Sequence, residues 1–367
     1  MQRTIKIRLK EDIDLVETIK EYNEVVNFCL SSGKINNTYN KNDIHKLTYY
    51  EIRGNSDLQS SMVCCARDQA SDMLKREKLR TLPFKKEFSG IRYNQRTFSW
   101  NGKELSISTI NGRRKYSINI PEYFNKYLRQ KYEFKSLTIF YKDIYIFIQI
   151  TLNIPDVEKL KVKDVLGIDR GIINPIVTSN NKFFNSKEIR RVKGKYSWLK
   201  SKLQSKGTPS AKRHLKRLSQ KEKRFVTNEN HRLAKKVVEM PYEVFSLEKL
   251  SIKRKKSNGK RFNKKLGTWS YFEFQKILEY KAEELGKQVV YVNPTNTSRC
   301  CSVCGNIEKS NRQGSTFKCK KCGFEINPDI NASRNIAELG KAFFSRLSVK
   351  QPIVTNLKGS VTSHLTC

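Results

Sequence analysis

The sequence predicts a multidomain α+β protein: an N-terminal β domain with an inserted helical module, then an α/β domain with an inserted zinc ribbon. Alternating apolar and polar residues flank a helical segment in the first 160 of the 367 residues. Strand and helix patterns alternate after residue 161, where four cysteines form two C-x2-C pairs. A chain of this length has room for two or three domains, each with its own core.

The first 83 residues combine one strand pattern with two helical patterns. Residues 2–9 alternate in polarity, which is typical of a half-buried strand. Two later runs have the apolar spacing of one helix face, namely Leu15, Ile19, Tyr22, Val26 and Cys29, then Leu58, Met62, Ala66, Ala70 and Met73. We therefore predict a helical module over residues 11–83 whose apolar faces pack into a core.

Strand patterns return between residues 84 and 160. Phe98 and Trp100 alternate with a polar residue, as do Leu105, Ile107 and Thr109 with their neighbours. Asn111-Gly112 is typical of a hairpin turn between antiparallel strands. A longer hairpin pattern turns at Lys142-Asp143. Closely spaced antiparallel strands predict a small barrel or sandwich, which residues 84–160 would form together with residues 1–10.

Residues 161–347 have the element order of an α/β domain, with the zinc ribbon at 297–325. The predicted elements are two strands over 165–180, a strand over 242–250, a helix over 269–285, a strand over 288–292 and a helix from Asp329 to about Phe344. The C-terminal tail, residues 348–367, has no periodic pattern, and we expect it to be disordered.

Two segments of this domain are strongly basic. Residues 186–225 contain fifteen Lys or Arg and two acids, and they predict a helical hairpin broken near Gly207-Thr208-Pro209. A charge run is usually a solvated surface, but an excess of one sign this large favours contact with nucleic acid. Residues 251–265 add eight basic residues and no acid, which indicates a mobile loop. Trp269 and Tyr271 follow it and are interpreted as packing residues, with base stacking as the alternative.

The net charge indicates the class of partner. The chain has 73 Lys and Arg against 35 Asp and Glu, a net charge of +38, which points to a polyanion and above all to nucleic acid. An anionic membrane is the rival partner, but no run of 18 apolar residues occurs. The N-terminus also lacks the apolar core of a signal peptide. We therefore expect no membrane partner and a cytoplasmic location.

The paired cysteines predict a structural zinc site. The four predicted ligands are Cys301, Cys304, Cys319 and Cys322. Four thiolates in two C-x2-C pairs suit a tetrahedral Zn²⁺, and a glycine follows each pair. Cys300 is the alternative to Cys301, but the two-residue gap before Cys304 favours Cys301. The cysteines at 29, 64 and 65 lie on apolar helical faces and are interpreted as core residues.

Three acids predict a Mg²⁺ site. Asp169 and Glu248 each end a predicted strand, and Asp329 begins the last helix, where the plainer role for an aspartate is that of an N-cap. Mg²⁺ prefers carboxylate oxygens and keeps water molecules for substrate phosphate. Two such ions can stabilise the attacking water and the leaving oxygen of a phosphodiester. The three acids are therefore the predicted catalytic residues.

These motifs resemble those of the TnpB family, transposon-encoded RNA-guided nucleases related to compact type V CRISPR effectors. The matching residues are Gly167-Ile168-Asp169, Leu247-Glu248-Lys249-Leu250, Tyr280-Lys281-Ala282-Glu283, Thr297-Ser298-Arg299, Asp329-Ile330-Asn331-Ala332 and Asn335-Ile336. The match to the family is dense over residues 165–340 and weaker over residues 1–160.

The resemblance implies a wedge-like β-barrel, a helical recognition module and an RNase H/RuvC-like nuclease domain. It also implies a guide RNA from the transposon end, bound by one protein copy, and cleavage of double-stranded target DNA beside a short flanking motif. An RNA–DNA heteroduplex would be held through its phosphates. The alternatives are an RNA-guided DNA-binding repressor that does not cut, and a nuclease or transposase accessory that acts without a guide.

Overall fold

The computed structural model divides into two compact units, Met1–Asp156 and Val157–Cys367, and each is considered by itself. The structure describes residues 2–101, 104–118, 120, 122–128, 133–142, 145–171, 174–185, 187–250, 259 and 271–348. Several predicted features lie outside these residues: the basic loop at 251–265 apart from Gly259, the residues Asp143 and Trp269, and the tail after Ser348.

The helical segment between β1 (Gln2–Leu9) and β2 (Ile91–Tyr93) of the N-terminal unit contains α1 (Ile13–Ile35), α2 (Lys41–Asn55) and α3 (Ser60–Glu77). Asp12 caps α1 by accepting a hydrogen bond from the Leu15 N–H at 3.1 Å. The apolar stripes predicted for the first and last of these helices are buried apart from Met73, which packs on the same core. Helix α2 is missing from the prediction because its buried face consists of Ile44, Thr48 and Ile52, and the threonine interrupts the apolar pattern.

The strands of the N-terminal unit form two antiparallel sheets. The first has the order β1-β7-β6-β2, with β1 Gln2–Leu9, β2 Ile91–Tyr93, β6 Glu133–Lys142 and β7 Tyr145–Asn153. The second has the order β3-β4-β5, with β3 Phe98–Trp100, β4 Glu104–Thr109 and β5 Gly112–Ser117. A short η1 (Glu122–Phe124) and α4 (Asn125–Leu128) follow β5. Both sheets share one hydrophobic core with the helices, and a closed barrel stays a prediction.

The C-terminal unit is built on a five-stranded sheet of order β10-β9-β8-β11-β12. Its strands are β8 Val165–Asp169, β9 Ile176–Thr178, β10 Phe183–Phe184, β11 Val244–Glu248 and β12 Gln288–Val292. β8, β11 and β12 are parallel to one another, whereas β9 pairs antiparallel with both β8 and β10. The helices are α5 (Lys187–Lys206), α6 (Pro209–Val238), α8 (Tyr271–Glu283) and α9 (Pro328–Ser348). A small sheet of β13 (Arg312–Gln313), β14 (Thr316–Lys318) and β15 (Glu325–Ile326), preceded by η3 (Lys309–Asn311), carries the cysteine segment.

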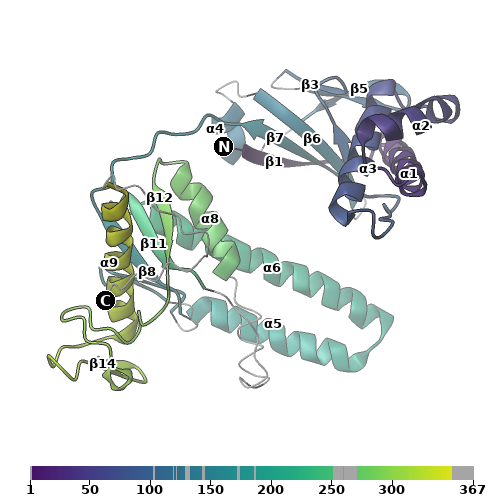
Figure 1. The fold of residues 1–367 in the computed structure, drawn as a ribbon. Coiled ribbons are helices and arrows are strands. Elements are labelled where there is room, and N and C mark those ends of the chain that lie inside the picture. The colour runs from purple at the N-terminus through teal and green to yellow at the C-terminus, as the bar shows by residue number, and fades with distance from the viewer. Residues whose placement is uncertain are drawn as a thin grey trace. The chain divides into compact units, whose positions relative to one another are not determined.

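The faces of this sheet are fixed by the alternation of side chains along each strand. Leu166 and Ile168 of β8 pack with Phe245 and Leu247 of β11 in the core formed with α6 and α8. The residues between them point to the opposite face, which α9 covers (Figure 1). Asp169 continues the alternation of β8, so it lies on the same side as α9.

Small residues let α9 lie directly on the strands. A Cβ atom on Gly167 would come within 1.9 Å of the Ser333 carbonyl oxygen, so no side chain fits there. A Cβ atom on Gly340 would come within 2.7 Å of the Ser246 hydroxyl. That hydroxyl donates to the Ile336 carbonyl at 2.8 Å. The close packing fixes the position of the first turn of α9 relative to the strand ends.

The basic segment at 186–225 forms the α5–α6 hairpin (Figure 1). Gly207, at a φ of +63°, turns the chain, and Thr208 caps α6 by accepting from the Ala211 N–H at 3.2 Å. Helix α5 has no fully buried residue, so most of its charge faces solvent. Within the described ranges, no helix is both long and apolar enough to cross a membrane.

Candidate metal centres

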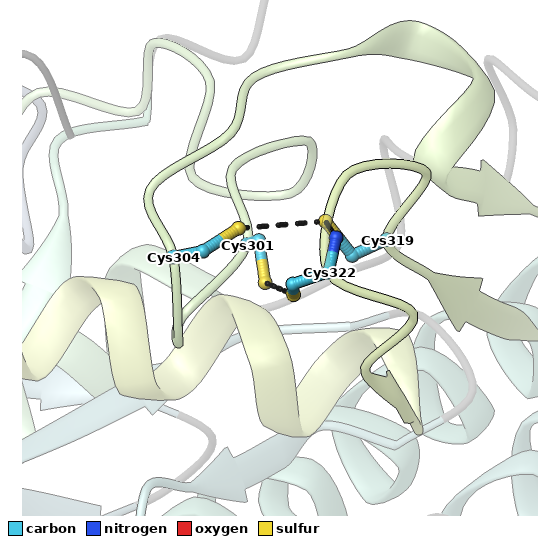
Figure 2. Close-up of side chains that lie close together, drawn as sticks. All are labelled: Cys301, Cys304, Cys319 and Cys322. Atoms are coloured by element: carbon cyan, nitrogen blue, oxygen red, sulfur yellow. Dashed lines mark hydrogen bonds between the residues drawn. The ribbon is translucent and has the colours of Figure 1, made fainter.

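The four predicted zinc ligands converge on one point in the C-terminal unit (Figure 2). The Sγ atoms of Cys301 and Cys322 lie 3.7 Å apart, and those of Cys304 and Cys319 lie 3.6 Å apart. All four sulfur atoms lie within 4.8 Å of one another. A tetrahedral Zn²⁺ with Zn–S bonds of about 2.3 Å requires sulfur atoms roughly 3.8 Å apart. The residues therefore fit zinc.

The backbone of each cysteine pair folds in the same way. The N–H of Gly305 donates to the Cys301 carbonyl at 3.0 Å, and that of Gly323 donates to the Cys319 carbonyl at 3.0 Å. Both glycines have positive φ, at +70° and +74°, which favours glycine there. Burial opposes ionisation of the Cys319 thiol, but nearby backbone N–H groups lower its pKa on balance. Cys300 is buried but does not join the sulfur cluster, which supports Cys301 as the ligand.

The three predicted carboxylates line one cavity of about 370 Å³. Asp169 and Glu248 end the adjacent parallel strands β8 and β11. The carboxyl ends of parallel strands meet at one edge of a sheet, so the two side chains come close together. Asp329 enters the cavity from the first turn of α9. The other lining residues are Arg170, Gly171, Pro294, Thr297, Ser298, Arg312 and Ala332.

Asp329 is not the N-cap of α9, because another residue caps this helix. Asn327 accepts from the Asp329 N–H at 2.9 Å and from the Ile330 N–H at 3.4 Å. Asn327 therefore performs the capping, and Asp329 lies one residue inside the helix. Its carboxylate is not used for capping and lines the cavity.

Electrostatic repulsion in the cavity favours a cation. Burial, followed by the charges of Glu248 and Asp329, raises the pKa of Asp169 to about 7. Burial also raises the pKa of Glu248, against the hydrogen bond from Thr297. Ionising several neighbouring carboxyl groups costs free energy, and a divalent ion bound among them lowers that cost. A divalent cation bound among the three acids would therefore relieve their mutual repulsion.

The spacing of the carboxylates differs from that of the cysteines. The cysteine group is the one set of three or more His, Cys, Asp or Glu in the described part of the chain whose ligand atoms all lie within 4.8 Å. The oxygens of the three acids are thus more widely spaced. This suits Mg²⁺ ions that each contact one or two carboxylates and complete their octahedral shell with water and phosphate oxygens.

Three polar side chains around the acids were not predicted as site residues. The Thr297 hydroxyl donates to Glu248 Oε1 at 2.5 Å. Asn174 Nδ2 donates to Asp329 Oδ2 at 3.3 Å, and Arg312 Nη2 lies 3.6 Å from Asp329 Oδ1. The sequence signals Thr297 through its place before the first cysteine pair, in the matching motif Thr297-Ser298-Arg299, but gives it no role in the site. It gives no signal for the two others, because they lie far from Asp329 along the chain.

Comparisons with known proteins find that parts of the chain are similar to transposon and CRISPR proteins. A family model described as "Probable transposase" matches residues 149–258, and one described as "Cas12f1-like, TNB domain" matches 271–336. The CRISPR-associated endodeoxyribonuclease Cas12f1 of Sulfoacidibacillus thermotolerans is 40% identical over 128 residues, covering 34% of this chain and 29% of that protein. A TnpB-like protein of Methanocaldococcus jannaschii is 30% identical over 157 residues, covering 41% of this chain and 56% of that protein. The chain thus spans less than two thirds of either relative, and the predicted resemblance to the TnpB family is confirmed.

A solved structure shares the fold. The cryo-EM structure of a Cas12f1-sgRNA-target DNA complex has a TM-score of 0.62 at 16% identity, covering 88% of this chain and 82% of that chain. At this identity the likeness concerns the fold alone. The chain has the mixed α/β, multidomain architecture of a compact Cas12 effector, with a four-cysteine site that fits a metal ion.

Proposed function

We propose, from the relationship of this chain to TnpB-like proteins and Cas12f1 endodeoxyribonucleases, that it is an RNA-guided DNA endonuclease encoded by a transposon. One observation carries the proposal. Asp169, Glu248 and Asp329, which lie far apart in the sequence, line one cavity where burial, followed by the charges of the two other acids, raises the pKa of Asp169 to about 7. Strongly perturbed carboxylates in a cavity are typical of a catalytic site.

The chemistry follows from the donor set. When bound, two Mg²⁺ ions supply Lewis-acid stabilisation of the attacking water and the leaving oxygen in phosphodiester hydrolysis. Asp169, Glu248 and Asp329 would hold these ions, and Thr297 would orient Glu248 through its 2.5 Å hydrogen bond. Arg312 lies next to Asp329, where its guanidinium can contact a phosphate oxygen.

The same proposal gives a role to each structural unit, to the four cysteines and to the α5–α6 hairpin. The C-terminal unit is the RuvC-like nuclease domain, and Cys301, Cys304, Cys319 and Cys322 hold a structural zinc ion. The N-terminal unit is the wedge-like barrel with its recognition helices. The α5–α6 hairpin contacts nucleic acid, and its Trp198 is 57% exposed with Lys202 Nζ 4.0 Å above the ring. An exposed aromatic beside a cation can stack on a base.

The partners follow from charge and relationship. A guide RNA from the transposon end, with one protein copy on each RNA, would direct the chain to double-stranded DNA. The net charge of +38 suits binding to the phosphates of the guide, the RNA–DNA heteroduplex and the displaced strand.

The test is guided cleavage by the full chain. The protein is purified with the RNA that accompanies it, that RNA is sequenced, and matched DNA with a randomised flank is supplied with Mg²⁺. We expect RNA of defined length and cleavage beside one short flanking motif. Guided binding without cleavage would favour the repressor alternative, and absence of a defined RNA would favour the guide-free accessory.

A further inference from the structure

Thr297 lies on the connection between the two candidate metal centres. The chain leaves β12 at Val292 and passes Thr297 before it reaches Cys301. Thr297 is 1% exposed, and its hydroxyl lies 2.5 Å from Glu248 Oε1 and 3.1 Å from the Pro294 carbonyl oxygen. A hydroxyl has one proton, so it donates to the nearer, charged acceptor. This bond holds the Glu248 carboxylate in one orientation.

Helix α9 fixes the backbone around Thr297. Asn335 Nδ2 donates to the carbonyl oxygens of Thr297 and Cys300, both at 2.8 Å. Asn331 Nδ2 donates to the same Cys300 carbonyl at 2.6 Å, and Asn331 Oδ1 accepts from the Ser302 N–H at 3.0 Å. The segment that leads into the first cysteine pair is thus bonded to the helix that carries Asp329.

We propose that Thr297 is the positioning residue through which the four-cysteine site sets the orientation of Glu248. Cys301 and Cys304 would hold zinc and so fix one end of the segment 297–302, and Asn331 and Asn335 hold the segment to α9. The Thr297 hydroxyl, held in place in this way, orients the Glu248 carboxylate through its hydrogen bond. The inference rests on the proposed function, because it assumes that Glu248 holds a divalent cation. Hydrogen-bond partners that orient a metal-ligating side chain contribute about 10- to 100-fold to metal affinity.

The test compares Thr297→Val with Thr297→Ser in the full-length, zinc-loaded protein. Valine keeps the shape and removes the hydroxyl, whereas serine keeps the hydroxyl. The readouts are Mn²⁺ affinity, from the electron paramagnetic resonance signal of free Mn²⁺, and zinc content. We expect valine to weaken Mn²⁺ binding about tenfold with zinc retained, and serine to bind Mn²⁺ as the unmodified protein does. Thr295→Val is the matched control. Thr295 is exposed and its hydroxyl donates to Asn293 Oδ1 at 2.8 Å rather than to any of the three acids, so this substitution is expected to leave both readouts unchanged.

Each outcome decides a separate point. Mn²⁺ affinity unchanged by Thr297→Val overturns the positioning role. Loss of zinc in that variant, or failure of Thr297→Ser to preserve Mn²⁺ affinity, assigns Thr297 to folding and also overturns it. The proposed function fails separately if the unmodified protein shows no Mn²⁺ binding that Asp169→Asn removes.

Discussion

Asp169→Asn is expected to reduce guided DNA cleavage by about 10³-fold or more, while guide RNA binding stays unchanged. Asparagine keeps the shape of the side chain but loses the charge that would hold a divalent ion. The measurement is cleavage of matched DNA in Mg²⁺, together with RNA affinity by filter binding. Asp164→Asn, at an exposed acid just before β8, is the matched control and should cut normally. Retained cleavage by Asp169→Asn would show that the catalytic site is elsewhere.

The same substitution should stabilise the protein when Mg²⁺ is absent. The folded-state pKa of Asp169 is raised to about 7, so the folded protein holds a proton that the unfolded chain releases near pH 4. Stability therefore falls as pH rises from about 4 to about 7, and the loss is complete above the folded pKa. At pH 8 we expect Asp169→Asn to raise the free energy of unfolding by a few kcal/mol, about 4 at most.

A pH series of thermal unfolding, in Mg²⁺-free buffer with zinc retained, measures this effect. The melting temperatures of Asp169→Asn and the unmodified protein should diverge between pH 4 and pH 7 and stay apart above it. Added Mg²⁺ should narrow the gap, because the ion stabilises only the protein that keeps the carboxylate. A gap that is constant with pH would mean that Asp169 is not held in a buried, repulsive site.

Cys301→Ser is expected to destabilise the C-terminal unit strongly. Structural zinc contributes on the order of 10 kcal/mol to the folding of small zinc sites, and loss of one thiolate removes much of that. We expect a decrease of roughly 4 kcal/mol, which lowers the melting temperature of a unit this size by about 10 °C. The measurements are zinc content by metal analysis and thermal unfolding.

Cys300→Ser is the matched control for the zinc ligand. Cys300 is buried beside Cys301 but lies outside the sulfur cluster, so its substitution should leave zinc content unchanged. Zinc lost from Cys300→Ser and kept by Cys301→Ser would reverse the ligand assignment. A fully stable and active Cys301→Ser protein would contradict a structural role for the zinc site.

The sequence predicts the parts of the candidate sites that depend on local spacing. The cysteine pairs are recognisable because each knuckle is closed within five residues by a glycine of positive φ, as at Gly305. Asp169 and Glu248 are recognisable because each ends an apolar strand, and parallel strands bring their ends to one edge. Neighbouring residues determine the geometry of each cysteine knuckle, whereas Asp169 and Glu248 are recognised by their local pattern and brought to one edge by strand pairing.

Contacts between distant segments are not predictable in the same way. Arg312 reaches Asp329 from the small sheet beside the cysteines, and Asn174 reaches it from the turn after β8. Neither residue has a spacing that relates it to the acid. Helix α2 is not recognisable in the sequence for a different reason. Thr48 interrupts the apolar pattern of its buried face, where the Thr48 hydroxyl donates to the Ile44 carbonyl at 2.7 Å.

The most direct test of the central claim is anomalous X-ray scattering from crystals of the full-length protein soaked in Mn²⁺, recorded above and below the manganese edge. The claim is that Asp169, Glu248 and Asp329 share divalent ions. We expect manganese peaks within about 2.5 Å of oxygens from at least two of these acids, lost in Asp169→Asn. Manganese bound elsewhere, with no peak in this cavity, would contradict the account.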